Sequence, residues 1–161
     1  MNAHPTAEQL IRGANADPGL VAVEPLPGDD QDEMLLYSRE GGKITSTRET
    51  FSPFLWFDRE ALLKDFPGTK EIRSLSGGGP LKHMAFFRTW KALQEALKHL
   101  KQTTGFTPSA PDAPFFYISD PVEQHLMSTG RTLFKGMAFE DLRRMQVDIE
   151  TYVSGGYDFP N

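Results

Sequence analysis

Asp148 and Glu150 are the side chains of this sequence whose types and spacing best suit metal chemistry. They stand two positions apart in residues 145–152, where apolar residues occupy the alternate positions. This alternation predicts a β-strand that places both carboxylates on one face and the apolar residues on the other. Carboxylate oxygens suit Mg²⁺ or Mn²⁺, and two such ions can promote phosphodiester cleavage. The same spacing also occurs on solvated edge strands, so alone it does not define a metal site.

A local excess of positive charge points to a second kind of chemistry. The chain has a net charge of −5, and residues 1–40 hold eight acidic residues against two basic ones. Residues 82–101, in contrast, hold five Lys or Arg residues against Glu95 alone. Lysines that neutralise phosphates release counterions, which predicts weak, salt-sensitive binding of single-stranded DNA. The candidate contacts are Lys82, Lys91, Lys98 and Lys101. The alternative is a solvated helix face.

Aromatic residues and a glycine-rich loop offer further candidates. Aromatic side chains on a sheet can stack unpaired bases, although packing in the core is the alternative for each of them. The aromatic candidates are Phe54, Trp56, Phe86 and Phe87. Residues 76–79 could surround a phosphate with Lys82 nearby, but they lack the spacing of a known phosphate-binding loop and are typical of a turn. The four histidines have no metal-ligand spacing.

Composition excludes several classes of protein. The sequence has no cysteine, which rules out disulfides, thiolate zinc sites and cysteine nucleophiles within it. No run approaches the roughly 18 apolar residues of a membrane span, and the polar first ten residues differ from a signal peptide. These features favour a cytoplasmic protein without a membrane partner.

The elements that would position these residues are mostly strands, followed by a strand–helix–strand part. Gly41-Gly42 separates two extended runs and predicts a β-hairpin. Thr89 and Gly105 bracket an amphipathic helix, and Asp120-Pro121 begins another. A short helix is expected over residues 59–66. The expected strands are 20–24, 33–40, 43–51, 54–57, 71–75, 81–87, 115–118 and 145–152. This order predicts an α+β fold.

Several of these segments together resemble the N-terminal end of a family B DNA polymerase. Asp148-Ile149-Glu150-Thr151 has the form of the family's first 3'-5' exonuclease motif. The segments before it also occur in the family's order, from about Gly19 onward. They are Phe51 to Phe57 (FSPFLWF), Ala85-Phe86-Phe87 with the helix after it, Ile118 to Met127, and Gly130 to Phe134 (GRTLF).

The resemblance implies three parts: a loose leader over residues 1–18, a polymerase N-terminal domain over 19–144, and the start of an exonuclease domain over 145–161. The N-terminal domain would combine a small β-rich part with a strand–helix–strand part like a ferredoxin or RNA-recognition fold. Residues 145–152 would be the first strand of a ribonuclease-H-like domain. Asp148 and Glu150 would be catalytic metal ligands, completing a two-metal Mg²⁺ or Mn²⁺ site only in the full-length parent.

The resemblance also implies partners and leaves alternatives open. The parent would be a DNA-directed DNA polymerase of replication or repair, and these residues would contact the single-stranded template or the primer end. Because the later acidic residues of such enzymes are absent, we expect a truncated fragment or partial reading frame that is inactive alone. The alternatives are a free-standing, non-catalytic nucleic-acid-binding module, or a polymerase-like exonuclease without the polymerase half.

Overall fold

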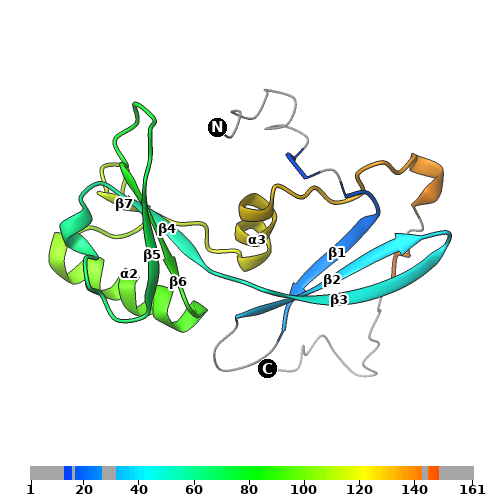
Figure 1. The fold of residues 1–161 in the computed structure, drawn as a ribbon, viewed down its shortest axis with the longest axis horizontal. Helices are drawn as coiled ribbons and strands as arrows, with labels where there is room; N and C mark the ends of the chain where they lie inside the picture. Colours follow the sequence, from blue (N-terminus) through cyan, green and yellow to red (C-terminus); the bar gives the residue numbers. More distant parts are fainter. Residues whose placement is uncertain (1–12, 16, 27–31, 143–144, 149–161) are drawn as a thin grey trace, which may run out of the picture.

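The computed structural model describes residues 13–15, 17–26, 32–142 and 145–148. It is an α+β fold with two antiparallel sheets, drawn apart in Figure 1 with helix α3 between them. The first sheet has the order β1-β2-β3, and the second has the order β5-β6-β4-β7. The strands are β1 (Leu20–Pro25), β2 (Glu33–Glu40), β3 (Lys43–Thr50), β4 (Phe54–Phe57), β5 (Thr69–Ser74), β6 (His83–Phe87) and β7 (Phe115–Phe116). The helices are η1 (Glu60–Leu62), α2 (Trp90–Thr104), α3 (Pro121–Thr129) and η2 (Phe139–Asp141).

The first sheet is built around the predicted hairpin. Gly41 and Gly42 connect β2 to β3 with φ of 55° and 81°, a left-handed conformation that glycine adopts without a steric penalty. The two strands pair in register from Glu40–Lys43 to Glu33–Thr50. The inward-facing side chains of this sheet form a small core with the residue that follows β3: Leu20, Met34, Leu36 and Phe51.

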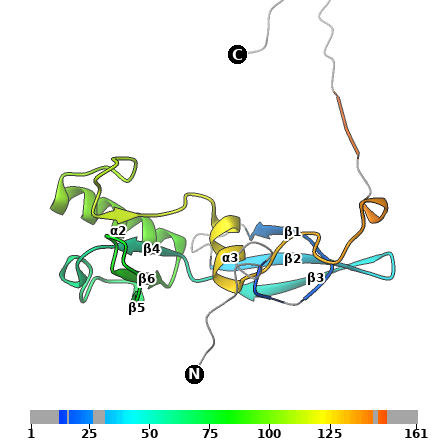
Figure 2. The ribbon, with the colours of Figure 1, turned by 90° about the horizontal axis from the view of Figure 1, so that it is seen from above.

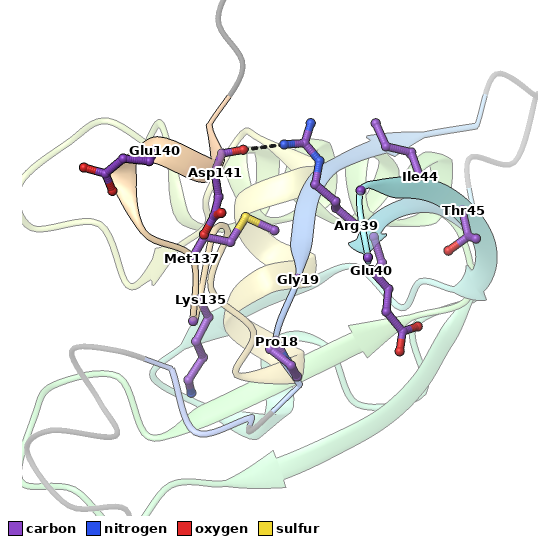
Figure 3. A pocket seen from close by; sticks show the side chains of 14 residues that line it. Pro18, Gly19, Arg39, Glu40, Ile44, Thr45, Lys135, Met137, Glu140 and Asp141 are labelled. Atoms are coloured by element: carbon purple, nitrogen blue, oxygen red, sulfur yellow. Dashed lines mark hydrogen bonds between the residues drawn. The ribbon is translucent and has the colours of Figure 1, made fainter.

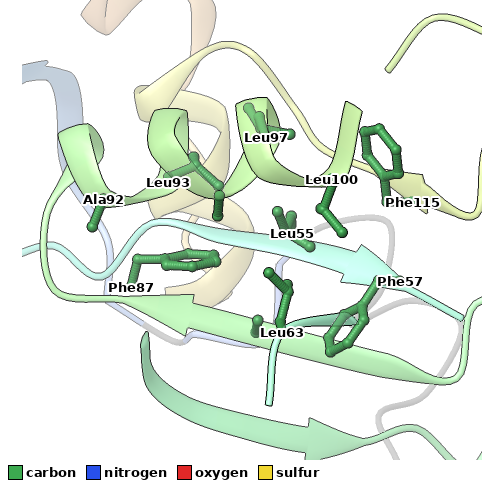
Figure 4. Close-up of a cluster of buried hydrophobic side chains, with 11 residues drawn as sticks. Leu55, Phe57, Leu63, Phe87, Ala92, Leu93, Leu97, Leu100 and Phe115 are labelled. Atoms are coloured by element: carbon green, nitrogen blue, oxygen red, sulfur yellow. The ribbon is translucent and has the colours of Figure 1, made fainter. Parts of the chain in front are cut away.

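The second sheet packs one face against α2. Leu55, Phe57 and Phe87 point from the strands toward the helix, as Figure 4 shows. Leu93 and Leu100 descend from α2 into the same core, and all five side chains are fully buried. Burying a Leu or Phe side chain contributes roughly 1.5–3 kcal/mol. This packing therefore fixes α2 on one face of the sheet.

Both longer helices begin and end where their capping residues indicate. The Thr89 side chain accepts a hydrogen bond from the Ala92 amide (3.1 Å), and α2 ends at Gly105. The Asp120 carboxylate accepts from the amides of Val122 (2.7 Å) and Glu123 (3.3 Å) to start α3. These side chains satisfy amides that have no partner within the helix.

Helix α3 joins the two sheets through buried polar and aromatic contacts. The buried Gln124 side chain accepts a hydrogen bond from the Phe54 amide (2.8 Å) and donates one to the Ile118 carbonyl (2.7 Å). Phe51 stacks on Trp90 of α2, with ring centroids 6.2 Å apart. It also meets the His125 ring edge-on at 6.1 Å. These hydrogen bonds and ring contacts hold the second sheet to the first.

Three predicted elements differ from the structure. The helix expected over residues 59–66 is only the 3₁₀ turn η1, since Arg59 supplies no side-chain cap and Asp65 takes a positive φ of 59°. So short a helix has too few hydrogen bonds to offset nucleation. The strand expected over 115–118 is the two-residue β7. Residues 145–148 have no regular secondary structure, and the rest of the strand predicted over 145–152 lies outside the described residues.

No helix in the described ranges is long and apolar enough to cross a membrane.

Candidate nucleic-acid interface

The face of the second sheet that points away from α2 carries an unusual set of side chains. Strand pairing places Phe116, Trp56, Met84 and Arg73 in one row across all four strands. Phe86 and Glu71 form part of the next row. We call these six residues the open face. Trp56, Met84 and Phe86 are half-buried, while Phe116 keeps 49% of its surface exposed.

The rings of the open face contact one another across the strands. Trp56 and Phe116 stack with centroids 5.7 Å apart and an interplanar angle of 27°. Trp56 meets Phe54 edge-on at 5.0 Å, and Phe54 lies 5.7 Å from Phe86. Their neighbours therefore hold these rings in place while part of the aromatic surface remains exposed. A rigid, exposed aromatic surface can stack an unpaired base at little cost in entropy.

Arg73 adds positive charge to the same face. Its guanidinium carbon lies 4.5 Å from the centroid of the Phe86 ring. The guanidinium also donates from Nε and Nη2 to the two carboxylate oxygens of Glu71, both at 2.7 Å. This hydrogen bonding raises the pKa of Arg73 and lowers the pKa of the Glu71 carboxyl. The pair is accordingly fully ionised at neutral pH.

The predicted aromatic candidates divide between the two sides of the sheet. Trp56 and Phe86 lie on the open face. Phe87 is fully buried against α2. Phe54 lies on the same side as Trp56 and Phe86 but is 1% exposed, so neither Phe87 nor Phe54 is available to a base. Phe116 and Arg73 were missed by the sequence analysis. The alternation within their strands could have suggested them, but only the strand pairing shows that they share a face with Trp56.

The four predicted lysines also divide. Lys82 immediately precedes β6. Its amide donates to the Phe57 carbonyl (2.9 Å), which extends the hydrogen bonding between β6 and β4 by one residue. The period of two then places Lys82 on the side of Met84 and Phe86. The other three lysines are exposed on α2, which covers the opposite face of the sheet. They are Lys91, Lys98 and Lys101. Only Lys82 thus joins the aromatic residues.

The glycine-rich loop lies beside Lys82 but presents a carbonyl to it. The Lys82 ammonium is 3.4 Å from the Gly77 oxygen. A phosphate-binding loop would instead turn its amides toward the ligand. Residues 76–79 are exposed, as expected for a turn.

The predicted metal ligands are not assembled in the described part of the chain. Asp148 is exposed, and Glu150 lies outside the described residues. Among the residues described, no three His, Cys, Asp or Glu side chains form a group that could hold a metal ion. The described residues therefore do not make a Mg²⁺ or Mn²⁺ site, and no catalytic step is assigned to them.

A partly buried charge cluster lies where α3 meets the first sheet. The Arg131 guanidinium donates to the Glu49 carboxylate at 2.5 Å, and Asp17 lies 3.8 Å from it. The hydrogen bond from Arg131 holds the pKa of Glu49 below its usual value. His125 lies 3.7 Å from Glu49, yet burial lowers the pKa of its imidazole, so it is neutral at pH 7. This cluster fastens α3 to β3.

A hollow of about 830 Å³ lies between the β2–β3 turn and residues 135–141, shown in Figure 3. Its basic side chains already have partners. Lys135 donates to the carbonyls of Gly13 and Asn15, and Arg39 donates to the Asp141 carbonyl at 2.5 Å. Glu40, Glu140 and Asp141 line the same hollow. Its mixed charge favours no class of ligand, in contrast to the open face.

A scan against models of protein families gives no match to this chain, and a search of the curated proteins likewise finds no relative.

Proposed function

We propose that this chain is the N-terminal region of a family B DNA polymerase, and that its open face binds single-stranded DNA. The observation that carries the binding proposal is the exposed surface of Trp56, Phe86 and Phe116, with Arg73 beside them. The order of sequence segments, from the FSPFLWF strand to Asp148-Ile149-Glu150-Thr151, supports the polymerase assignment.

The order in which the strands and helices of the second sheet follow one another supports a ferredoxin or RNA-recognition type of domain. Its elements follow the order β4, η1, β5, β6, α2, β7, and its strands lie in the order β5-β6-β4-β7 with all neighbours antiparallel. A β-α-β-β-α-β domain would have this order if η1 replaced its first helix. Figure 2 gives a second view of this sheet and α2.

The positions of the aromatic residues support the same assignment. RNA-recognition domains stack bases on aromatic residues of the sheet face that their helices leave uncovered. Here β4 and β6 are the two central strands, and they carry Trp56 and Phe86 on the face away from α2. Phe116 extends that surface onto β7. Lys82 is suitably placed to contact the phosphate backbone.

Binding of a labelled oligothymidylate, followed by fluorescence anisotropy at low salt, tests the interface. Trp56→Ala should weaken binding about 10-fold, because stacking is worth ~1–3 kcal/mol per base. Phe106→Ala is a matched control, since Phe106 is 39% exposed but lies beyond the end of α2. Equal affinity of the Trp56→Ala variant and the parent would exclude the open face as the binding site.

The exonuclease part of the proposal rests on the motif around Asp148 and Glu150. In a polymerase parent these carboxylates would bind Mg²⁺ or Mn²⁺ together with acidic residues from later segments. Isothermal titration of the chain with Mn²⁺ should then show only weak binding, reduced further by Asp148→Ala. Tight binding that survives this substitution would contradict the assigned ligands.

The gene's reading frame after codon 161 discriminates the alternatives. Further exonuclease acids followed by polymerase aspartates would support the polymerase. Exonuclease acids alone would support an exonuclease without the polymerase half. A stop codon would support a free-standing binding module. The location of the parent in the cytoplasm is part of the same proposal.

A further inference from the structure

The open face offers a cationic surface beside its aromatic one. The guanidinium of Arg73 lies over one side of the Phe86 ring, 4.5 Å from its centroid, while 58% of the side chain remains exposed. The Phe86 ring is therefore partly covered, and the exposed flat surface at this place is that of the guanidinium. Planar guanidinium groups, like aromatic rings, stack against unpaired bases.

Glu71 determines how that guanidinium lies. It stands two residues from Arg73 on β5, so both side chains leave the strand on the same face. Its two oxygens accept from Nε and Nη2 at 2.7 Å each. A two-point pairing of this kind fixes the orientation of the guanidinium plane, which a single contact would not. It also leaves Nη1 free of this pairing.

The two surfaces have a defined spacing. Arg73 and Trp56 lie in the same row of the sheet, separated by Met84 on β6. Neighbouring strands are about 4.8 Å apart, so Arg73 and Trp56 lie roughly 10 Å apart across the sheet. Different bases of one strand can therefore occupy the two places.

We propose that Arg73 is a second base-stacking residue of the open face, and that Glu71 positions it. The proposal rests on the proposed function, because it assigns a further residue to the same interface. It makes Glu71 an acidic residue that strengthens the binding of a polyanion. The occupant is a single strand with unpaired bases, either DNA or RNA, since stacking does not distinguish them.

Substitutions at Arg73 separate stacking from charge. Arg73→Lys retains the positive charge but removes the flat surface. Its affinity for oligothymidylate should fall about 5-fold, as expected for the loss of ~1 kcal/mol of stacking. Its affinity for an abasic backbone of equal length should stay within about 2-fold of the parent value, because phosphate contacts depend on charge. Equal loss for both ligands, or no loss for either, would overturn the stacking role.

Substitutions at Glu71 test the positioning role. If Glu71 acted only through its charge, Glu71→Ala should tighten binding to both ligands. We expect it instead to weaken binding to oligothymidylate about 3-fold, as partial loss of the ~1 kcal/mol stacking contact. Glu71→Gln retains an acceptor oxygen and should recover part of the loss. Glu95→Ala, on the exposed side of α2, is the matched control and should not weaken binding. Tighter binding by Glu71→Ala would overturn the proposal.

The Trp56→Ala variant distinguishes a failure of the proposed function from a failure of the roles assigned to Arg73 and Glu71. If it binds as the parent does, the proposed function fails and the inference fails with it. If it loses affinity while the Arg73→Lys and Glu71→Ala variants do not, only the further inference is overturned. Oligouridylate measured in parallel compares RNA with DNA, and an equal dependence on Arg73 for both is the expected result.

Discussion

The face of the second sheet that α2 covers and the open face are made by neighbouring residues of the same strands. Phe87 is fully buried beneath α2, whereas Phe86 is half-buried on the other side. Phe115 is 1% exposed and Phe116 is 49% exposed. The covered aromatic residues are explained by the core they build. The aromatic residues of the open face bury less of their surface and therefore stabilise the fold less. They also stand where an antiparallel sheet usually carries polar residues, on its solvent side.

We propose that the open face is kept aromatic for an interaction. Its residues are not scattered, because Trp56, Phe116 and Phe86 occupy adjoining positions on three strands. Contiguous exposed apolar surface commonly marks a binding site. Substitutions on the covered face should therefore change stability, whereas those on the open face should change binding.

Phe87→Ala should produce the largest effect. Removing a fully buried Phe ring leaves a cavity beneath α2 and should lower the free energy of unfolding by about 3–5 kcal/mol. Urea denaturation followed by circular dichroism measures it. A loss below about 1 kcal/mol would mean that the two faces do not differ in the way described.

Phe116→Ala should show the opposite behaviour. Its affinity for oligothymidylate should fall about 5-fold, since the stacked partner of Trp56 is lost. Its free energy of unfolding should change by less than about 1 kcal/mol, as for most surface substitutions. Phe115→Ala is the matched variant from the same strand and should be destabilised instead. Similar stability losses in both variants would remove the distinction between the faces.

The contact between Arg131 and Glu49 lies outside both faces and should affect stability alone. The folded-state pKa of Glu49 is lowered, so its stabilisation is present above the usual pKa of 4.5 and is lost as pH falls through the lower folded value. Arg131→Met should cost on the order of 1 kcal/mol at pH 7. It should also flatten the decrease in stability below pH 4.5. Unchanged acid sensitivity in this variant would contradict the assignment to Glu49.

Substitutions of the lysines should produce the smallest effect, a change in how binding affinity depends on salt. Lys82→Ala should reduce the slope of log affinity against log salt by about 0.7, the value for one phosphate contact with a single strand. The triple substitution of Lys91, Lys98 and Lys101 by alanine should leave the slope nearly unchanged, because α2 places them on the far side of the sheet. If the triple variant reduced this slope more than Lys82→Ala does, the interface would lie on α2 and not on the open face.

Local sequence signals predicted most of the fold. The Gly41-Gly42 turn and the capping residues Thr89 and Asp120 act through neighbouring backbone, so their effects can be read from a few adjacent residues. The helix expected over 59–66 was wrong because its end depends on Asp65, which adopts a positive φ that composition does not reveal. The length of β7 depends on its pairing with β4, which is not a local property.

The site could be predicted only in part for the same reason. The sequence indicated Trp56 and Phe86 as stacking candidates, together with Phe54 and Phe87, which are buried. Which face α2 covers is decided by tertiary packing, and that choice buries Phe87. Phe54 shares the face of Trp56 and Phe86 but is buried at 1% exposure, which the sequence does not reveal. Arg73 was missed because its role depends on a cross-strand contact with Phe86. The metal assignment of Asp148 and Glu150 remains a prediction.

The two tryptophans allow the central claim to be measured within one molecule. Trp56 lies on the open face, whereas Trp90 lies on α2 and packs against both cores. Titration of ¹⁵N-labelled protein with oligothymidylate, followed through the two indole N–H signals, compares them directly. We expect the Trp56 signal to shift until it saturates while the Trp90 signal stays in place. An unmoved Trp56 signal at saturating oligonucleotide would contradict it.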